Sequence, residues 1–198
     1  MEDLSYPIGK YQGAGDVRQW IDEIATAPAR LRAAVQGLSP EQLDTPYRPG
    51  GWTVRQVAHH VPDSHLNSYV RFRLALTEAE PIIKPYDQEQ WAGLIDARTA
   101  PVEVSLSLLD ALHERWTLLL RSLTPADWRR TFRHPELGLV TLEWNAGLYA
   151  WLWTASRRAH HFAAGPDGVG VKDKSKGKGK GQKSKMRRAA GGLSPKPT

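Results

Sequence analysis

Four long segments of the chain carry apolar residues at the spacing of amphipathic helices. The first begins near Asp16, a residue type that caps helix N-termini, and passes through Pro28, which is expected to interrupt or kink it. The second begins at Thr53 and is expected to reach about residue 78, the third covers roughly residues 101–123, and the fourth starts around Leu142. One apolar stripe per helix predicts an all-α protein built as a four-helix bundle.

Shorter elements are expected in the connections between these helices. Ser39–Pro40 and Thr124–Pro125 each combine a capping residue with a proline at the first helical position, which favours a short helix. The stretch "QEQWAGL" predicts another, and "TFRHPELGLVTLEW" combines alternating apolar residues with a turn, which is typical of a small hairpin. In the third long helix the expected apolar stripe consists of Val104, Leu108, Leu112, Trp116 and Leu119.

The composition changes abruptly after Trp151. Residues 152–198 hold twelve Lys and Arg against two Asp and end in a Lys/Gly-rich run, so this tail is expected to be disordered. Residues 1–151 hold the other 15 basic and 19 acidic residues, so the net charge of +6 comes from the tail and the helical part does not favour nucleic acid. The pattern predicts a bundle domain over 1–151, with a truncated or disrupted fourth helix, followed by a disordered basic tail over 152–198.

The chain has no cysteine, which limits the chemistry available to it. Disulfides and thiolate metal sites are excluded, so any metal ion must be held by His, Asp or Glu. No apolar run approaches the roughly 20 residues that span a bilayer. The start "MEDLSYPIGKYQ" lacks the basic-then-apolar order of a signal peptide. We therefore expect a cytoplasmic protein with no membrane contact.

A cluster of histidines lies in the second long helix, in the stretch "VRQVAHHVPDSHLNSYVRF". Gln56, His60, Asp63 and Asn67 share one helical face, at positions i, i+4, i+7 and i+11. Helix bundles build metal sites from inward side chains of this kind, but the spacing alone favours a partly buried His60 that is hydrogen-bonded to Asp63 or Asn67. On the same helix, His59 and His65 are expected to be surface groups. The remaining candidates, His113 and His134, belong to no cluster and are expected to be structural.

Several longer stretches resemble the YfiT-like metal-dependent hydrolases of the DinB superfamily. They are "LRAAVQGLSPEQLDTPYRPGGWTVRQVAHHV", "IKPYDQEQWAGL", "LHERWTLLLRSLT" and "AGLYAW", and the resemblance covers about residues 4–151. It implies a homodimeric, cytoplasmic four-helix bundle with one divalent metal ion, zinc or nickel, held by three histidines. Related bundles include thiol S-transferases that use bacillithiol or similar low-molecular-weight thiols.

The resemblance also implies where the three ligands lie. The first is the second histidine of "HH", which is His60 here. The other two come from the fourth helix, at the residue after the tryptophan and four residues later, and these positions hold Leu152 and Ser156. Neither can replace an imidazole, and zinc takes three protein ligands even in catalytic sites. Gln56, Asp63 and Asn67 remain candidates for contacts to the ligand histidine or to the substrate.

The protein sequence permits the missing histidines when the tail is read in another frame. Written as degenerate codons and read one base later, the chain from Trp153 onward permits Gly-Arg-His-His-x-Ala-His-Ile, which is the pattern of the resembling family. One extra base just after the codon of Trp151 would therefore explain the loss of both ligands and the change in composition. The alternatives are a genuine extension whose basic run binds a polyanion, or His160 or His161 acting as a ligand from a rearranged helix.

The chemistry implied by a complete site takes two forms. A metal ion on three neutral imidazoles keeps open positions, where it can activate water for hydrolysis or bind a thiol as thiolate for transfer. The sequence therefore predicts a metal-dependent hydrolase with a small-molecule substrate, with a thiol S-transferase as the alternative. A third possibility is an inactive bundle with a polyanion-binding tail. The chain as given is expected to lack tight metal binding.

Overall fold

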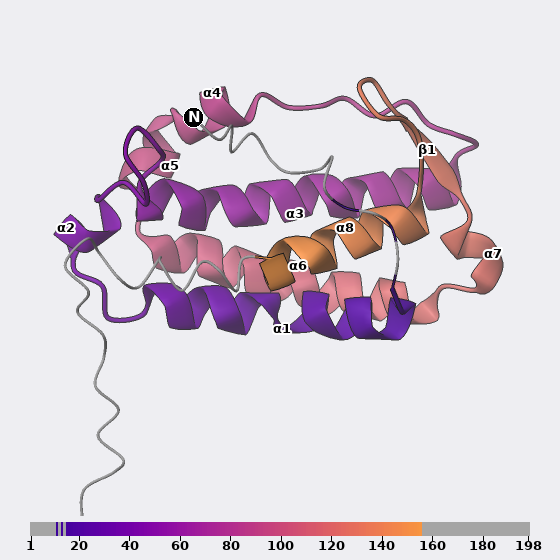
Figure 1. The fold of residues 1–198 in the computed structure, drawn as a ribbon, viewed down its shortest axis with the longest axis horizontal. Helices are drawn as coiled ribbons and strands as arrows, with labels where there is room; N and C mark the ends of the chain where they lie inside the picture. Colours follow the sequence, from indigo (N-terminus) through magenta and orange to yellow (C-terminus); the bar gives the residue numbers. More distant parts are fainter. Residues whose placement is uncertain (1–10, 12, 14, 156–198) are drawn as a thin grey trace, which may run out of the picture.

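The computed structural model describes residues 11, 13 and 15–155, with side chains up to Leu152. In chain order the elements are α1 (Val17–Val35), α2 (Pro40–Leu43), α3 (Val54–Thr77), α4 (Gln88–Ala92), α5 (Ile95–Thr99), α6 (Val102–Ser122), α7 (Pro125–Trp128), β1 (Thr131–His134), β2 (Gly138–Thr141) and α8 (Leu142–Ala155). The predicted all-α bundle is confirmed (Figure 1). The predicted basic tail lies outside the described residues.

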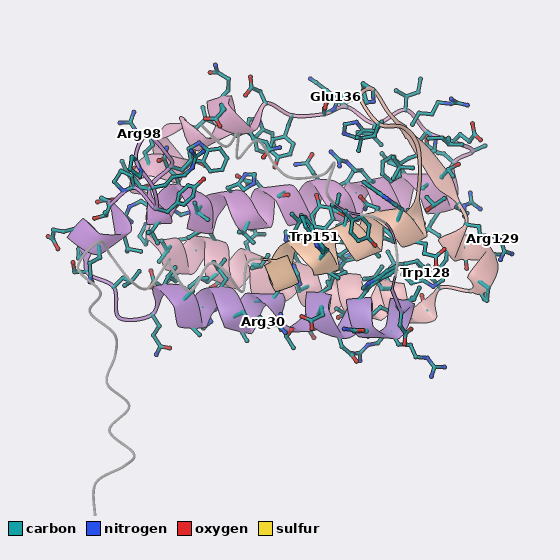
Figure 2. The ribbon with its side chains drawn as sticks, in the orientation of Figure 1. Arg30, Arg98, Trp128, Arg129, Glu136 and Trp151 are labelled. Atoms are coloured by element: carbon teal, nitrogen blue, oxygen red, sulfur yellow. The ribbon has the colours of Figure 1, made fainter. Side chains whose placement is uncertain are left out.

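Four long helices form the bundle. Helix α1 packs on α6 and α8, and α3 packs on the same two helices from the other side (Figure 1). The side chains that fill the interior include Ile24, Phe72, Leu109, Trp116, Leu120, Phe132 and Leu142, all with less than 2 % of their surface exposed. Trp128 turns inward at one end, whereas Arg98 and Arg129 lie at the periphery (Figure 2). Within the described residues, none of the helices is long and apolar enough to cross a membrane.

The helix starts follow from local capping chemistry. The side chain of Asp16 accepts a hydrogen bond from the N–H of Arg18 at the start of α1. Thr53 and Gln56 form a reciprocal capping box at the start of α3. Because these contacts involve residues two or three positions apart, the sequence alone predicts the starts of both helices.

Helix α1 continues through Pro28, so the interruption that the sequence allowed at this position does not occur. Proline has no N–H to donate to the carbonyl four residues earlier, which is that of Ile24. The ring of His113 from α6 replaces this donor, with its Nδ1 2.7 Å from the Ile24 oxygen. The buried proline and the buried histidine therefore compensate for one another across the α1–α6 contact.

The buried face of α6 differs from the predicted stripe. Its buried apolar residues are Val102, Leu106, Leu109, Leu112, Trp116 and Leu120. Val104 is 63 % exposed and Leu108 is 45 % exposed, so that part of the prediction is wrong. The helix is rich in leucine on two faces, and the face that also carries His113 is the one that packs against α1 and α3.

The hairpin and the chain before α4 cover one face of α3. Strands β1 and β2 pair antiparallel, with Phe132 opposite Val140, and both of these side chains point inward. The N–H of Ile83 donates to the carbonyl of Arg133 at 3.0 Å, which fastens the α3–α4 connection to β1. A space remains between this cover, α3 and α8, and it contains the candidate site.

Candidate functional site

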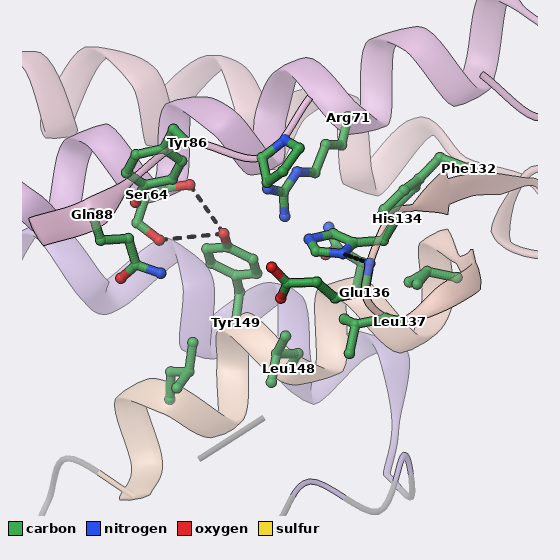
Figure 3. A pocket seen from close by; sticks show the side chains of 14 residues that line it. Ser64, Arg71, Tyr86, Gln88, Phe132, His134, Glu136, Leu137, Leu148 and Tyr149 are labelled. Atoms are coloured by element: carbon green, nitrogen blue, oxygen red, sulfur yellow. Dashed lines mark hydrogen bonds between the residues drawn. The ribbon is translucent and has the colours of Figure 1, made fainter. Parts of the chain in front are cut away.

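A cavity of about 120 Å³ lies between α3, α8, the hairpin and the α3–α4 connection (Figure 3). Its polar lining comprises Ser64, Arg71, Tyr86, Gln88, His134, Glu136, Asn145 and Tyr149, and its apolar lining comprises Pro85, Phe132, Leu137, Val140, Leu148 and Leu152. Small-molecule sites combine apolar walls with polar groups that orient the ligand, and this cavity has lining of both kinds.

Two hydrogen bonds set the register of α8 against α3. The Asn145 amide donates to Ser68 Oγ at 2.8 Å. The Tyr149 hydroxyl donates to the Ser64 carbonyl at 3.0 Å, and Figure 3 shows the two residues side by side. Each step of four residues is about one helical turn, so the chain runs in opposite directions in the two helices. One further turn places positions 152 and 153 of α8 opposite His60 of α3.

His60 is buried at the end of this face, with 6 % of its surface exposed. Its ring lies 4.8 Å from the ring of Trp52 and 6.4 Å from that of Tyr86, which lines the cavity. Burial lowers the pKa of His60 to about 4, so the imidazole is neutral at pH 7. The neutral imidazole is the form that binds metal ions.

The structure gives the other predicted candidates on α3 local contacts. The Gln56 amide accepts a hydrogen bond from Thr53 N–H and donates to the Ala92 carbonyl at 2.7 Å, which ties α3 to α4. Asn67 donates to the backbone oxygen of Asp63 at 2.9 Å. Asp63 is half-buried, and burial together with the charge of Asp96 raises its pKa to about 6. None of these three lines the cavity described above, and their role toward a substrate stays a prediction.

The polar groups of α3 that do line the cavity are Ser64 and Arg71, four and eleven residues after His60. Viewed down the helix axis, Ser64 and Arg71 lie just to one side of His60, whereas Asp63 and Asn67 lie just to the other side. The sequence pattern alone offered both faces, and only the packing of α8 selects the one with serine and arginine.

We expect Asp63→Asn to stabilise the protein at pH 7. The raised pKa means that the ionised carboxylate is less favourable in the fold than in the unfolded chain, so its cost is absent well below pH 4 and grows as the pH rises through about 6. Urea unfolding at pH 7 and at pH 5 tests this, because the stabilisation should be smaller at pH 5, and the exposed Asp22→Asn is the matched control. A variant no more stable than the parent at pH 7 would contradict the expectation.

His59 and His65 are buried, so the prediction that they lie on the surface is wrong. The Nδ1 of His59 is 2.7 Å from Ser105 Oγ, and its Nε2 is 3.1 Å from the Ala100 carbonyl, which joins α3 to the start of α6. The Nδ1 of His65 is 2.7 Å from Nε2 of His113. His59, His65 and His113 therefore connect helices in the interior. Of these three, a structural role was predicted only for His113.

The side chains present do not fit the metal ion that the resemblance implies. In the part of the chain that the structure describes, no three His, Cys, Asp or Glu residues lie close enough together to hold one. Leu152 lines the cavity at the position where the resemblance implies an imidazole, and a hydrocarbon side chain offers no electron pair. Ser156 lies outside the described residues. His60 alone does not make a metal site.

Comparisons with known proteins agree with this architecture. The family model described as DinB superfamily matches residues 23–151. "Putative metal-dependent hydrolase OB0782" from Oceanobacillus iheyensis is 51% identical over 163 residues, covering 80% of this chain and 91% of that protein. "Putative metal-dependent hydrolase BcerKBAB4_2443" from Bacillus mycoides is 55% identical over 156 residues, covering 76% of this chain and 90% of that protein.

A solved structure is similar over the same region. YfiT from Bacillus subtilis, described as "a probable metal-dependent hydrolase with an unusual four-helix bundle topology", superposes with a TM-score of 0.72 at 49% identity. The match covers 81% of this chain and 92% of the YfiT chain. With the family model matched over most of the bundle, this chain belongs to the DinB superfamily.

Proposed function

We propose that this domain is the framework of a metal-dependent hydrolase, in which His60 is one metal ligand and the cavity beside it receives the substrate. The observation that carries the proposal is the register of α8 on α3, which brings position 152 opposite a buried, neutral His60 at the edge of the cavity. The names of the similar proteins support the same class of activity.

In the chain as given this framework is incomplete. Leu152 and Ser156 stand where the other two imidazoles are expected, so we expect neither tight binding of zinc or nickel nor hydrolysis. Imidazole ligands suit both metals, and the choice between them depends on more than the donor set. The homodimer, and the polyanion-binding alternative for the tail, stay predictions.

We further propose that the two histidines are absent because of one extra base after the codon of Trp151. The family model ends its match at residue 151, where the composition also changes. A genuine extension explains the change of composition but gives no reason why the neighbouring frame permits the histidine pattern of the resembling family.

The test uses the chain translated with one base removed after Trp151, incubated with zinc or nickel. We expect it to hydrolyse p-nitrophenyl acetate, and we expect both the chain as given and a His60→Ala variant of the restored chain to be inactive. Conjugation of monochlorobimane with bacillithiol, assayed in parallel, separates the alternatives. Transfer without ester hydrolysis would replace the hydrolase by the thiol S-transferase, and no metal-dependent activity of either kind would contradict both.

A further inference from the structure

Arg71 lies at the end of the cavity remote from His60. Eleven residues separate the two along α3, which is about 16 Å along the helix axis. Arg71 is half-buried, and its side chain reaches into the cavity toward His134 and Glu136 (Figure 3). Its guanidinium makes neither a hydrogen bond nor an ion pair with any residue that the structure describes.

Other arginines near the cavity or on α3 are already engaged. Arg55 pairs with Asp44 at 2.7 Å, Arg133 pairs with Glu80 at 2.7 Å, and Arg73 donates to the Tyr69 hydroxyl at 3.2 Å. A guanidinium carries five N–H donors in a planar fork that matches a carboxylate. A half-buried guanidinium whose donors face a cavity is therefore suited to an anionic ligand.

His134 adds a second donor beside Arg71. Its Nδ1 accepts a hydrogen bond from the N–H of Glu136 at 3.2 Å, which leaves the proton of the neutral ring on Nε2. Burial, followed by the charge of Arg71, lowers the pKa of His134, so the ring is neutral at pH 7. A neutral imidazole with a fixed tautomer donates one hydrogen bond without requiring a counterion of its own.

The rest of the cavity is small, and its lining is mixed: Ser64, Tyr86, Gln88, Asn145 and Tyr149 are polar, and the other residues are apolar. Phe132, Val140, Leu148 and the ring of Tyr149 supply apolar surface to this lining. Its volume of about 120 Å³ is close to that of the roughly 150 Å³ cavity that takes benzene in another protein. The space therefore suits a compact body, such as an aromatic ring, with one charged end.

We propose that Arg71 binds a carboxylate, and that the cavity takes small carboxylic acids whose apolar part points along α3 toward His60. The proposal deepens the proposed function, because it names the substrate class of the same cavity. Carboxylate binding needs no metal ion, however, so it can be tested on the chain as given. Glu136 lies at the same end and its charge opposes the ligand, so its removal is expected to strengthen binding.

Benzoate and its neutral isostere benzamide are the probes. Their dissociation constants are measured by NMR titration against the full chain and three variants, Arg71→Gln, Glu136→Gln and Arg73→Gln. We expect benzoate to bind about ten times more tightly than benzamide, since a charge-assisted bidentate pair is worth at least that factor. Arg71→Gln should abolish the difference while leaving benzamide affinity unchanged, which also shows that the cavity is intact.

Arg73→Gln is the matched control, because it removes the same charge two residues away on an exposed side chain. It should leave benzoate affinity within about twofold, which excludes a general effect of net charge. The proposal is overturned by equal affinities for the two probes, by benzoate affinity that survives Arg71→Gln, or by no binding of either probe at about 10 mM. Loss of hydrolysis in the restored chain, with benzoate binding intact, would count against the proposed function alone.

Discussion

Acidification from pH 7 to about 4 is expected to unfold this protein, with the buried pair of His65 and His113 as a major cause. Burial is the main reason that the pKa of His113 falls to about 4, and burial with the neighbouring rings lowers that of His65 well below its usual range. Both side chains ionise readily once the chain unfolds. The stability that they contribute is therefore present above pH 6.5 and is lost as the pH falls toward 4.

The size of the effect follows from the shift. A displacement from 6.5 to about 4 corresponds to about 3 kcal/mol for His113 alone, and His65 adds to it. Since a domain is stable by only about 5–15 kcal/mol, this loss is a large part of the total. The hydrogen bonds require both histidines to be neutral. His113 donates through Nδ1 to the Ile24 carbonyl and accepts through Nε2 from His65, which a protonated ring could not do.

Urea unfolding at several pH values between 7 and 4.5 measures this dependence. His113→Gln is expected to be less stable at pH 7, because the carbonyl left free by Pro28 loses its donor. Its free energy of unfolding is also expected to fall less steeply as the pH is lowered, because the variant takes up about one proton fewer on unfolding. The same slope in the parent and the variant would contradict the assignment.

Replacement of Leu152 and Ser156 by histidine is expected to create tight binding of zinc or nickel. Position 152 lies opposite His60, and position 156 follows four residues later in the sequence. Three neutral imidazoles supply the number of protein ligands found in catalytic zinc sites. We expect the affinity for zinc to rise by at least about a thousandfold over the chain as given, well within the binding energies of protein zinc sites.

Isothermal titration with zinc at pH 7 measures this gain, with Leu152→His alone and the double variant carrying His60→Ala as controls. Both controls leave two imidazoles and are expected to bind far more weakly than the double variant. Binding that is unchanged by His60→Ala would show that the metal ion is held elsewhere. Unfolding in the presence of zinc gives a second readout, because a ligand of the folded state raises its stability.

The helices were predictable from the sequence because their ends depend on neighbours a few residues apart. Asp16, Ser39 and Thr53 each cap a helix through local hydrogen bonds, and the predicted hairpin also forms. Choices between two equally spaced faces were not predictable in this way. The buried stripe of α6 and the cavity face of α3 are both selected by packing between distant segments.

The candidate site was predictable only in part. His60 belongs to a recognisable pattern, and its burial beside Trp52 agrees with an interior role. Arg71 gave no signal, because an arginine eleven residues away on a helix is usually a surface group. The compensation of Pro28 by His113 was equally hidden, since it joins residues 85 positions apart. Contacts of this kind become visible only in three dimensions.

The nucleotide sequence across the codons for residues 149–161, read again from genomic DNA, tests most directly the claim that this chain is a metal-dependent hydrolase with two ligands lost. The account predicts one base fewer after the codon of Trp151, with Trp-His-Gly-Arg-His-His as the resulting sequence. Histidines then stand at positions 152, 155 and 156, and position 152 lies opposite His60. If the frame is as given, Leu152 is genuine, the metal site is broken in this protein, and the basic tail has an origin of its own.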